Sequence, residues 1–217
     1  LPTFAAKWLI PRLPQFQQLH PQVTLHFVPY VHSYDFERPE LDCSILFGEG
    51  HWPGAHAHYI TGNEVALIAP RTRVADWTID TPGDVAHHTL MRHVTVPEAW
   101  LRWSETHGVE SLIDPLAGPQ FDQFQTMIRA VMAGMGLALV PRCLVQDEIT
   151  AGVVREPLAD AARRGGYQSD VGYWLCYPEG RTQLHALQCF RQWVLACAEP
   201  VDAMDAAAAI QPPAAPA

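Results

Sequence analysis

The stretch FDQFQTMIRAVMAGMGLALVP, residues 121–141, carries the clearest structural signal in the chain. Its apolar residues recur every three or four positions, which predicts one face of an amphipathic helix: Phe124, Met127, Ile128, Val131, Met132 and Met135. Asp122, with Gln125 three residues later, matches a capping box that would begin this helix. The Gly-Met-Gly that follows would end it, and residues 137–140 then predict a strand. A helix followed directly by a strand indicates an α/β fold.

Helices and strands keep alternating outward from this stretch. At the start of the chain, Leu9, Leu13 and Phe16 have helical spacing, and the helix they predict must be kinked by two prolines and ended by Pro21. Further helices are predicted at 97–106, which stops at Gly108, and at 141–149 and 184–197. Strands are predicted at 23–28, 41–47, 64–69, 90–91, 153–155 and 171–177. The order favours an α/β protein throughout.

Composition narrows the classes of protein that the chain can represent. The 217 residues are 48% hydrophobic and 17% charged, which is typical of a folded globular chain. A net charge of −9 argues against a nucleic-acid surface, and no apolar run reaches the roughly 20 residues that a membrane span needs. The first residues show no secretory signal, and the five cysteines lack CxxC spacing, so reduced thiols are expected.

The motifs that usually carry chemistry are missing or wrongly placed. His51, His56 and His58 do not have a recognised metal-ligand spacing, so no metal is expected there. Gly134-Met135-Gly136 follows a predicted helix and precedes a strand, which is the reverse of a phosphate-binding loop. No Gly-x-Ser-x-Gly, His-Glu-x-x-His or P-loop motif occurs. We therefore expect no catalytic residue and no cofactor.

Five segments in order resemble the regulatory domain of LysR-type transcriptional regulators, in the glycine-cleavage-activator subgroup. They are LPTFAAKWLIPRL (1–13, closing at His20-Pro21), LDCSILFGEGHWPG (41–54), PEAW (97–100), GPQFD (118–122) and AGMGLALVP (133–141). The resemblance extends over about residues 1 to 197. It also accounts for the prolines of the first helix.

The resemblance implies a fold like the type II periplasmic binding proteins, with two Rossmann-like lobes and a central cleft. Lobe one would comprise residues 1–69 and 172–199, and lobe two residues 70–171. The lobes would be joined by crossover strands near 66–70 and 171–177. The tail at 200–217 is expected to be disordered because its Ala- and Pro-rich sequence cannot bury a face. The family's winged helix-turn-helix, linker helix and first strand would precede this chain.

The resemblance also implies where a small-molecule effector binds. From lobe one it would meet Thr3, His32, Ser33 and Phe47, and from lobe two His93, Phe121 and Asp122. These residues suit such a role, because helix starts present unpaired amides, hydroxyls orient polar groups and aromatic rings form apolar walls. Two alternatives stay open at this point: Thr3 could serve only as a helix cap, and Phe121 only as a core residue of lobe two.

These expectations together predict an effector-sensing domain and no enzyme activity. The domain would act in the cytoplasm as a homodimer or homotetramer, and it would reach DNA only through the N-terminal part of the regulator. An extracytoplasmic solute-binding protein of the same fold is the alternative. A small-molecule enzyme is a third possibility, which would need an activated pair of residues.

Overall fold

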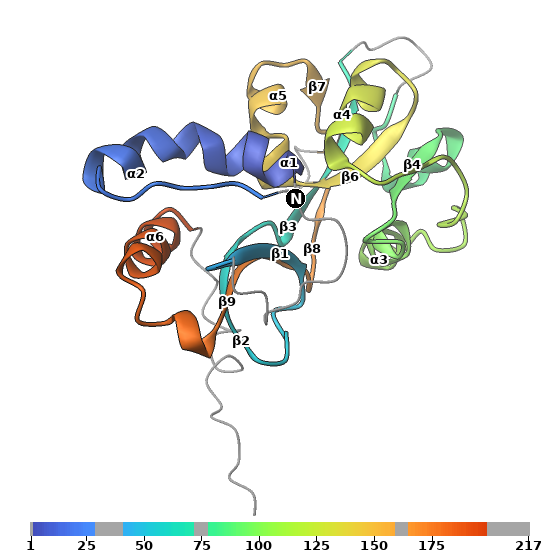
Figure 1. The fold of residues 1–217 in the computed structure, drawn as a ribbon. Helices are drawn as coiled ribbons and strands as arrows, with labels where there is room; N and C mark the ends of the chain where they lie inside the picture. The colour runs from blue at the N-terminus through green and yellow to red at the C-terminus, as the bar shows by residue number, and fades with distance from the viewer. Residues whose placement is uncertain (1, 29–40, 72–77, 159–164, 199–217) are drawn as a thin grey trace, which may run out of the picture.

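The computed structural model describes residues 2–28, 41–71, 78–158 and 165–198, which form two bodies (Figure 1). Each body is built on its own β-sheet. The elements combine helices and strands, but the strands between residues 44 and 70, and those between 154 and 178, follow one another without a described helix between them. Among the described residues, no helix has both the length and the apolar character that crossing a membrane requires.

The smaller sheet has three strands in the order β1-β9-β2, with β1 at Ser44–Gly48, β9 at Gly172–Pro178 and β2 at Ala55–Thr61. Both outer strands run antiparallel to β9. Helix α6 (His185–Ala196), which follows the short η6 (Glu179–Arg181), packs against this sheet. Its Phe190 and Trp193 meet the ring of Phe16, with centroids 5.6 and 5.1 Å away.

The larger sheet has the order β5-β4-β6-β3-β7, with β8 also paired to β3. Its strands are β3 (Glu64–Pro70), β4 (Leu90–His93), β5 (Gln120–Phe121), β6 (Leu137–Pro141), β7 (Val154–Arg155) and β8 (Tyr167–Gln168). Strand β4 runs parallel to β5 and β6, whereas β3 is antiparallel to all its partners. Its helices are η4 (Pro82–His87), α3 (Ala99–His107), α4 (Phe124–Met132), η5 (Arg142–Leu144) and α5 (Gln146–Thr150).

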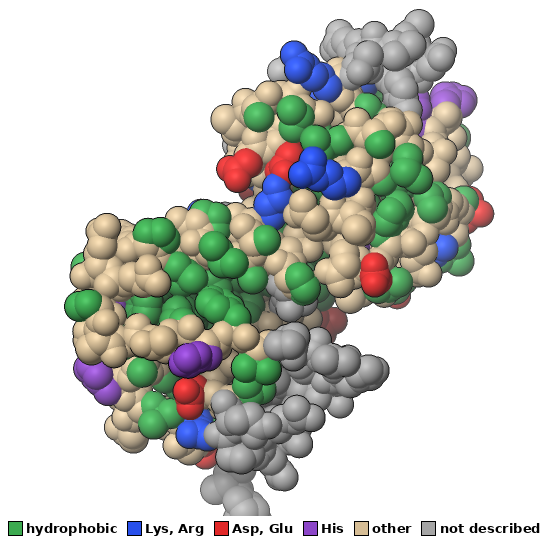
Figure 2. All heavy atoms as spheres, turned by 45° about the horizontal axis from the view of Figure 1, so that its top comes forward, with side chains coloured by type: hydrophobic (Ala, Val, Ile, Leu, Met, Phe, Trp, Pro, Cys, Tyr) green, Lys and Arg blue, Asp and Glu red, His purple; other side chains and the backbone are tan. Residues whose placement is uncertain are grey.

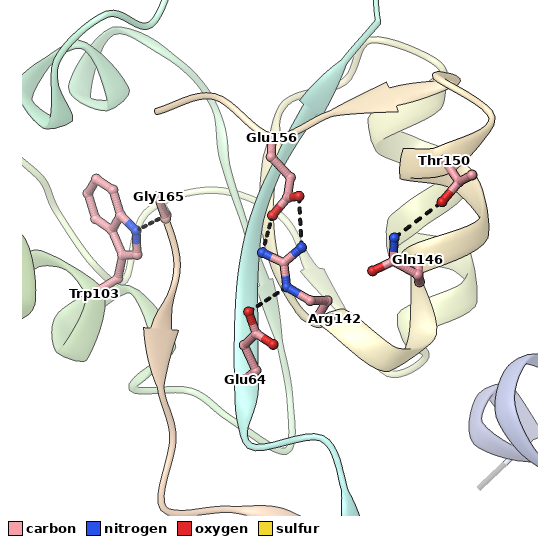
Figure 3. A network of polar contacts seen from close by, with 7 residues as sticks. All are labelled: Glu64, Trp103, Arg142, Gln146, Thr150, Glu156 and Gly165. Atoms are coloured by element: carbon pink, nitrogen blue, oxygen red, sulfur yellow. Dashed lines mark hydrogen bonds and ion pairs between the residues drawn. The ribbon is translucent and has the colours of Figure 1, made fainter. Parts of the chain in front are cut away.

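Strand β3 is buried on both faces, which explains its uninterrupted apolar run. Ala66 and Ile68 point into a core shared with the smaller sheet, whereas Val65 and Leu67 point into a second core. This division follows from the alternation of side chains along a strand. The second core lies under α3, whose Trp103 Nε1 donates to the carbonyl of Gly165 at 2.8 Å (Figure 3).

The first helix is irregular, as its prolines predict. It consists of α1 (Pro2–Phe4), a π-helical turn η1 (Ala5–Leu9), a 3-10 turn η2 (Ile10–Arg12) and α2 (Leu13–Leu19). Proline lacks an N–H and its ring displaces the preceding turn, so a regular α-helix cannot continue through it. The segment extends from the junction of the two bodies along the body of the smaller sheet (Figure 1).

Several predicted elements are confirmed with small shifts. The strands predicted at 64–69, 90–91, 153–155 and 171–177 are β3, β4, β7 and β9. The helix predicted at 97–106 is α3, which ends at Gly108 in the left-handed conformation with φ 67°. The helix predicted at 184–197 is α6, and the one predicted at 141–149 is divided into η5 and α5. The tail at 200–217 lies outside the described residues.

Two local predictions are wrong, and one strand was not predicted. Residues 23–28 are not a strand, although Val23 and Leu25 pack on the core and their neighbours are exposed. The segment has the alternation of a strand, but a strand also needs a hydrogen-bonded neighbour, and no described strand pairs with it. No side-chain cap from Asp122 begins α4, whose N-cap is Gln123. Strand β2 was not predicted, because its alternating Ala and His residues lack β-branched side chains at its start.

The chain passes between the sheets at two places. It leaves the smaller sheet after Thr61 and enters the larger one at Glu64, and it returns between Gln168 and Gly172. Gly62, at the first crossing, has φ 101°, and a Cβ there would lie 2.6 Å from Cδ2 of Tyr173. Only glycine suits this position. The lobe boundaries expected at residues 69 and 172 stay a prediction.

Candidate functional site

The candidate site lies where strands of the larger sheet end against the smaller sheet. Strand β4 ends at His93, the parallel strand β5 ends at Phe121, and α4 begins at Phe124. In α/β sheets, ligands bind beyond the carboxyl ends of parallel strands, where helix starts and loops converge. The smaller sheet brings Phe47 of β1 to the same place, because the rings of Phe47 and Phe124 are 6.0 Å apart.

His93 is the buried polar side chain at this edge, with only 5% of its surface exposed. Its Nδ1 lies 2.8 Å from the hydroxyl of Thr95 and accepts from the Thr95 backbone N–H at 3.2 Å. Its ring stacks on Phe124, with centroids 3.8 Å apart and planes 8° from parallel. Burial lowers the pKa of His93 from 6.5 to about 4, although the nearby Asp122 favours the charged form. The imidazole is therefore neutral at physiological pH.

Aromatic rings connect the two sheets at this point. Phe47 contacts Tyr173 of β9 at 4.7 Å between centroids, and Tyr173 contacts Phe4 of α1 at 4.3 Å. Burial raises the pKa of the Tyr173 hydroxyl well above its ordinary value, so it stays neutral. The sequence reasoning missed Phe124 and Tyr173 as members of the site. Their signals were available, since Phe124 is the first residue of its helix and Tyr173 lies on a strand beside a crossing.

Thr3 connects the first helix to the start of α4. Its Oγ1 accepts a hydrogen bond of 3.2 Å from the backbone N–H of Gln125, in the first turn of α4. Thr3 therefore satisfies one of the amides that an α-helix leaves unpaired at its start, and it does so for a helix 122 residues away. Lys7 of η1 and Glu148 of α5 form an ion pair nearby, which also joins the first helix to the larger-sheet body.

These contacts hold the two bodies closed against each other. The cavity between them has a volume of about 10 Å³, which is about the space of one water molecule. Its lining includes Phe47 from the smaller sheet and Val96, Phe124 and Leu139 from the larger one. In this arrangement the space between the two bodies is too small for an organic molecule.

Comparison with known proteins places this architecture in a family. The family model described as "LysR substrate binding domain" matches residues 1–198. The chain is a member of the LysR substrate-binding-domain family. It is 31% identical over 196 residues to the HTH-type transcriptional activator AmpR of Providencia stuartii, and this match covers 89% of the chain and 63% of that protein. It is 28% identical over 197 residues to the glycine cleavage system transcriptional activator of Escherichia coli K12, covering 90% and 62%.

Solved structures agree with this assignment. The effector domain of AmpR from Pseudomonas aeruginosa is 29% identical, with a TM-score of 0.76, and the match covers 89% of this chain and 90% of that one. The AmpR effector-binding domain of Citrobacter freundii is 26% identical with the same TM-score, covering 89% and 92%. The fold is thus type II periplasmic-binding-protein-like, and the described residues form two separate sheets. The matches favour a regulator over a solute-binding protein or an enzyme.

The chain spans 63% and 62% of the length of these two curated relatives, which is less than two thirds. Of the residues expected to meet the effector, the structure places Thr3, Phe47 and His93 around the interlobe contact. Phe121 is half-buried and packs on the shared core, and Asp122 is exposed beside it. His32 and Ser33 lie outside the described residues.

A larger cavity of about 320 Å³ lies elsewhere in the domain, and its lining comprises Ala86 and residues 88–90, 112–114 and 117–118. It lies at the beginning of β4, opposite the end that carries His93. Because ligands favour the carboxyl ends of parallel strands, the interlobe site is the better candidate despite its small volume.

Two of the three histidines considered for a metal, His56 and His58, contact the ring of Tyr177, with centroids 5.4 and 5.6 Å away. Nε2 of His58 lies 2.8 Å from the Tyr177 hydroxyl, which also accepts a hydrogen bond from Arg191. Burial, and then the charge of Arg191, lower the pKa of His58. Within the described ranges, no group of three or more His, Cys, Asp or Glu residues is arranged to hold a metal ion.

Proposed function

We propose that this chain is the effector-sensing domain of a LysR-type transcriptional regulator and binds a small polar molecule between its lobes. The observation that carries the proposal is the family match over residues 1–198, together with the likeness to AmpR effector domains over nearly the whole described chain. The closed interlobe cavity supports a sensing role. A molecule that binds an open or rearranged state better than this one shifts the equilibrium between them.

DNA binding, in this proposal, belongs to another part of the regulator, and the domain itself has no catalytic role. The net charge of −9 opposes contact with phosphates, which requires clustered Lys and Arg. The regulator would work in the cytoplasm, where it meets DNA. A gel-shift assay at moderate salt tests the assignment. Tight binding of this domain alone to a defined operator would show that the DNA-binding function is wrongly assigned to another part of the regulator.

A thermal-shift screen with small organic acids and amino acids tests the sensing function directly. A ligand that binds only the folded domain stabilises it by about 2.7 kcal/mol at 100 times its dissociation constant. At least one chemical class should raise the melting temperature in a concentration-dependent way. Silence across a broad library would reject the sensing function.

The proposed contacts are tested by removing one polar group at a time. Ser33→Ala, Thr3→Ala and His93→Ala should each weaken a ligand found in the screen by about 1–3 kcal/mol, because each leaves a buried polar group unpaired. Thr106→Ala is the control, since Thr106 is exposed on α3 and bonds only to Arg102 of its own helix. Titration calorimetry provides the measurement. The site is misplaced if all three variants stay within about 0.3 kcal/mol of the parent.

A further inference from the structure

The hydrogen bonds of His93 determine which ring nitrogen carries its proton. The backbone N–H of Thr95 can only donate, and it points to Nδ1 at 3.2 Å. Nδ1 must therefore accept, and the Thr95 hydroxyl at 2.8 Å can reinforce this arrangement by donating as well. A neutral imidazole with an accepting Nδ1 carries its proton on Nε2. The ring is consequently fixed as the Nε2–H tautomer.

The Nε2–H group is buried and makes no hydrogen bond within the described part of the chain. The backbone carbonyl of Asp122 interacts with the ring and favours its charged form, but it does not complete a hydrogen bond to Nε2. A buried donor without an acceptor is costly, so its retention calls for an explanation. The neighbours of His93 indicate an explanation. Its ring stacks on Phe124, and its backbone carbonyl accepts a hydrogen bond from the N–H of Val96. Phe124 and Val96 both line the interlobe cavity.

The stacking on Phe124 leaves the donor direction open. The nearly parallel rings cover one face of the imidazole, whereas Nε2–H points outward in the plane of the ring. Phe124 can thus hold the ring in place while the edge of the ring meets another group. The described part of the domain thus holds a rotationally fixed donor next to its cleft, and the Asp122 carbonyl beside it does not satisfy this donor with a hydrogen bond.

We propose that His93 is the donor that selects the effector, and that the effector presents an oxygen that only accepts, from a carboxylate or a carbonyl, to Nε2–H. This inference rests on the proposed sensing function and names the chemistry of its ligand. An ammonium group at the same place would set donor against donor, because the Nδ1 lone pair is already occupied by Thr95. The site therefore accepts acids and amides and rejects the corresponding amines.

The first test needs no ligand. Long-range proton–nitrogen NMR spectra of the nitrogen-15-labelled domain distinguish the two neutral tautomers of a histidine. His93, assigned through the loss of its signals in His93→Gln, should show the Nε2–H pattern near neutral pH. An Nδ1–H pattern would overturn the inference, whatever the domain binds.

The second test uses matched triplets of compounds in the thermal-shift screen. Each triplet shares one carbon skeleton, such as phenyl or butyl, and carries a carboxylate, a primary carboxamide or an ammonium group. Acids or amides should stabilise the wild-type domain, with the matched amines weaker by about tenfold or more in apparent affinity. His93→Phe keeps a stacking ring without the donor and should lose about the same factor. His93→Gln, whose amide N–H₂ can take the place of Nε2–H, should retain most of the affinity.

The outcomes separate this inference from the proposed function. If compounds bind but the amines bind equally well, or His93→Phe binds as tightly as the parent, the domain still senses ligands and the role of His93 is wrong. If no compound in the broad library or the triplets binds, the sensing function fails and the inference fails with it.

Discussion

At the scale of single residues, His93 should make the stability of the domain depend on pH. Its pKa is about 4 in the folded domain, compared with an ordinary value of 6.5, because burial disfavours the charged ring. The unfolded chain therefore binds more protons between these values. Protonation of His93 therefore does not lower the free energy of unfolding above about pH 6.5. As the pH falls toward 4 the free energy of unfolding decreases, by about 2 kcal/mol between pH 7 and pH 5.

Denaturant unfolding at several pH values measures this contribution. Other groups also titrate in the range, so the informative quantity is the difference between the wild type and His93→Gln, which should shrink by about 2 kcal/mol on going from pH 7 to pH 5. His26→Gln, at an exposed histidine, is the control and should follow the wild type. Parallel curves for wild type and His93→Gln would show that His93 is not buried as described.

Thr3 provides a second test at this scale. Thr3→Val keeps the shape of the side chain but removes the acceptor for the Gln125 amide, so the start of α4 loses its cap. The free energy of unfolding should fall by about 0.5–2 kcal/mol. Thr106→Val removes an exposed hydroxyl that donates to Arg102 within α3, and it should change stability by less than about 0.5 kcal/mol. Equal effects of the two substitutions would argue against the contact between Thr3 and α4.

At the scale of elements, Arg142 fixes the segment after β6 to two strands. Its Nη atoms donate to both carboxylate oxygens of Glu156 at 2.8 and 2.5 Å, and its Nε donates to Glu64 at 2.6 Å (Figure 3). Glu64 begins β3 and Glu156 follows β7, so one guanidinium joins three elements next to the first crossing between the lobes. The planar donors of arginine suit this arrangement, and those of lysine do not.

Removing the guanidinium should destabilise the domain by about 2–3 kcal/mol, because Arg142→Met takes away the arginine that pairs with the largely buried carboxylate of Glu156 and also contacts Glu64. Adding Glu64→Gln and Glu156→Gln should recover much of the loss. Arg102→Met is the matched control, since Arg102 pairs with Asp170 and Glu98 through exposed side chains and should cost less than about 1 kcal/mol. A loss no larger for Arg142→Met than for Arg102→Met would contradict this account.

At the scale of the whole molecule, hydrophobic side chains gather on the lower body of Figure 2, which carries the smaller sheet and the first helix. Ile10, Leu19, Phe27 and Val28, on the first helix and just after it, are 51% to 61% exposed. Exposed apolar side chains that gather on one face are typical of an interface. We expect the domain to form antiparallel dimers at micromolar concentration, in which this region of one protomer meets an element of lobe two of its partner, and sedimentation velocity can measure this.

Leu19→Glu should shift the domain toward monomer, because it places a charge in the apolar interface. Leu116→Glu makes the same change of charge at a residue that is 65% exposed on the larger-sheet lobe, and it should leave the dimer intact. Sedimentation as a monomer at all concentrations would count against the interface. Equal loss of dimer in both variants would place the interface elsewhere.

The sequence by itself determined the elements whose signals are local. The apolar run of β3, the stop at Gly108 and the stripe of α4 as far as Met132 follow from periodicity and backbone preference, and the structure has them, whereas Met135 lies beyond α4 and is 52% exposed. The resemblance in five ordered segments predicted the family and the two-lobed fold, which the comparisons show. It also named Thr3, Phe47 and His93, which the structure brings to one place.

Only the tertiary structure decided what depends on partners far away in the chain. Residues 23–28 have a strand pattern, but no described neighbour supplies the hydrogen bonds that would make them a strand. The Thr3 hydroxyl caps α4 rather than its own helix, because the closed lobes bring Gln125 within 3.2 Å. In the sequence, Phe124 and Tyr173 have the pattern of buried residues of a helix and a strand. In the structure both contact the ring of Phe47, which brings them to the cleft. The periodicity of apolar residues predicts which side of a helix or strand is buried. Which other element covers that side depends on how the sheets pack together.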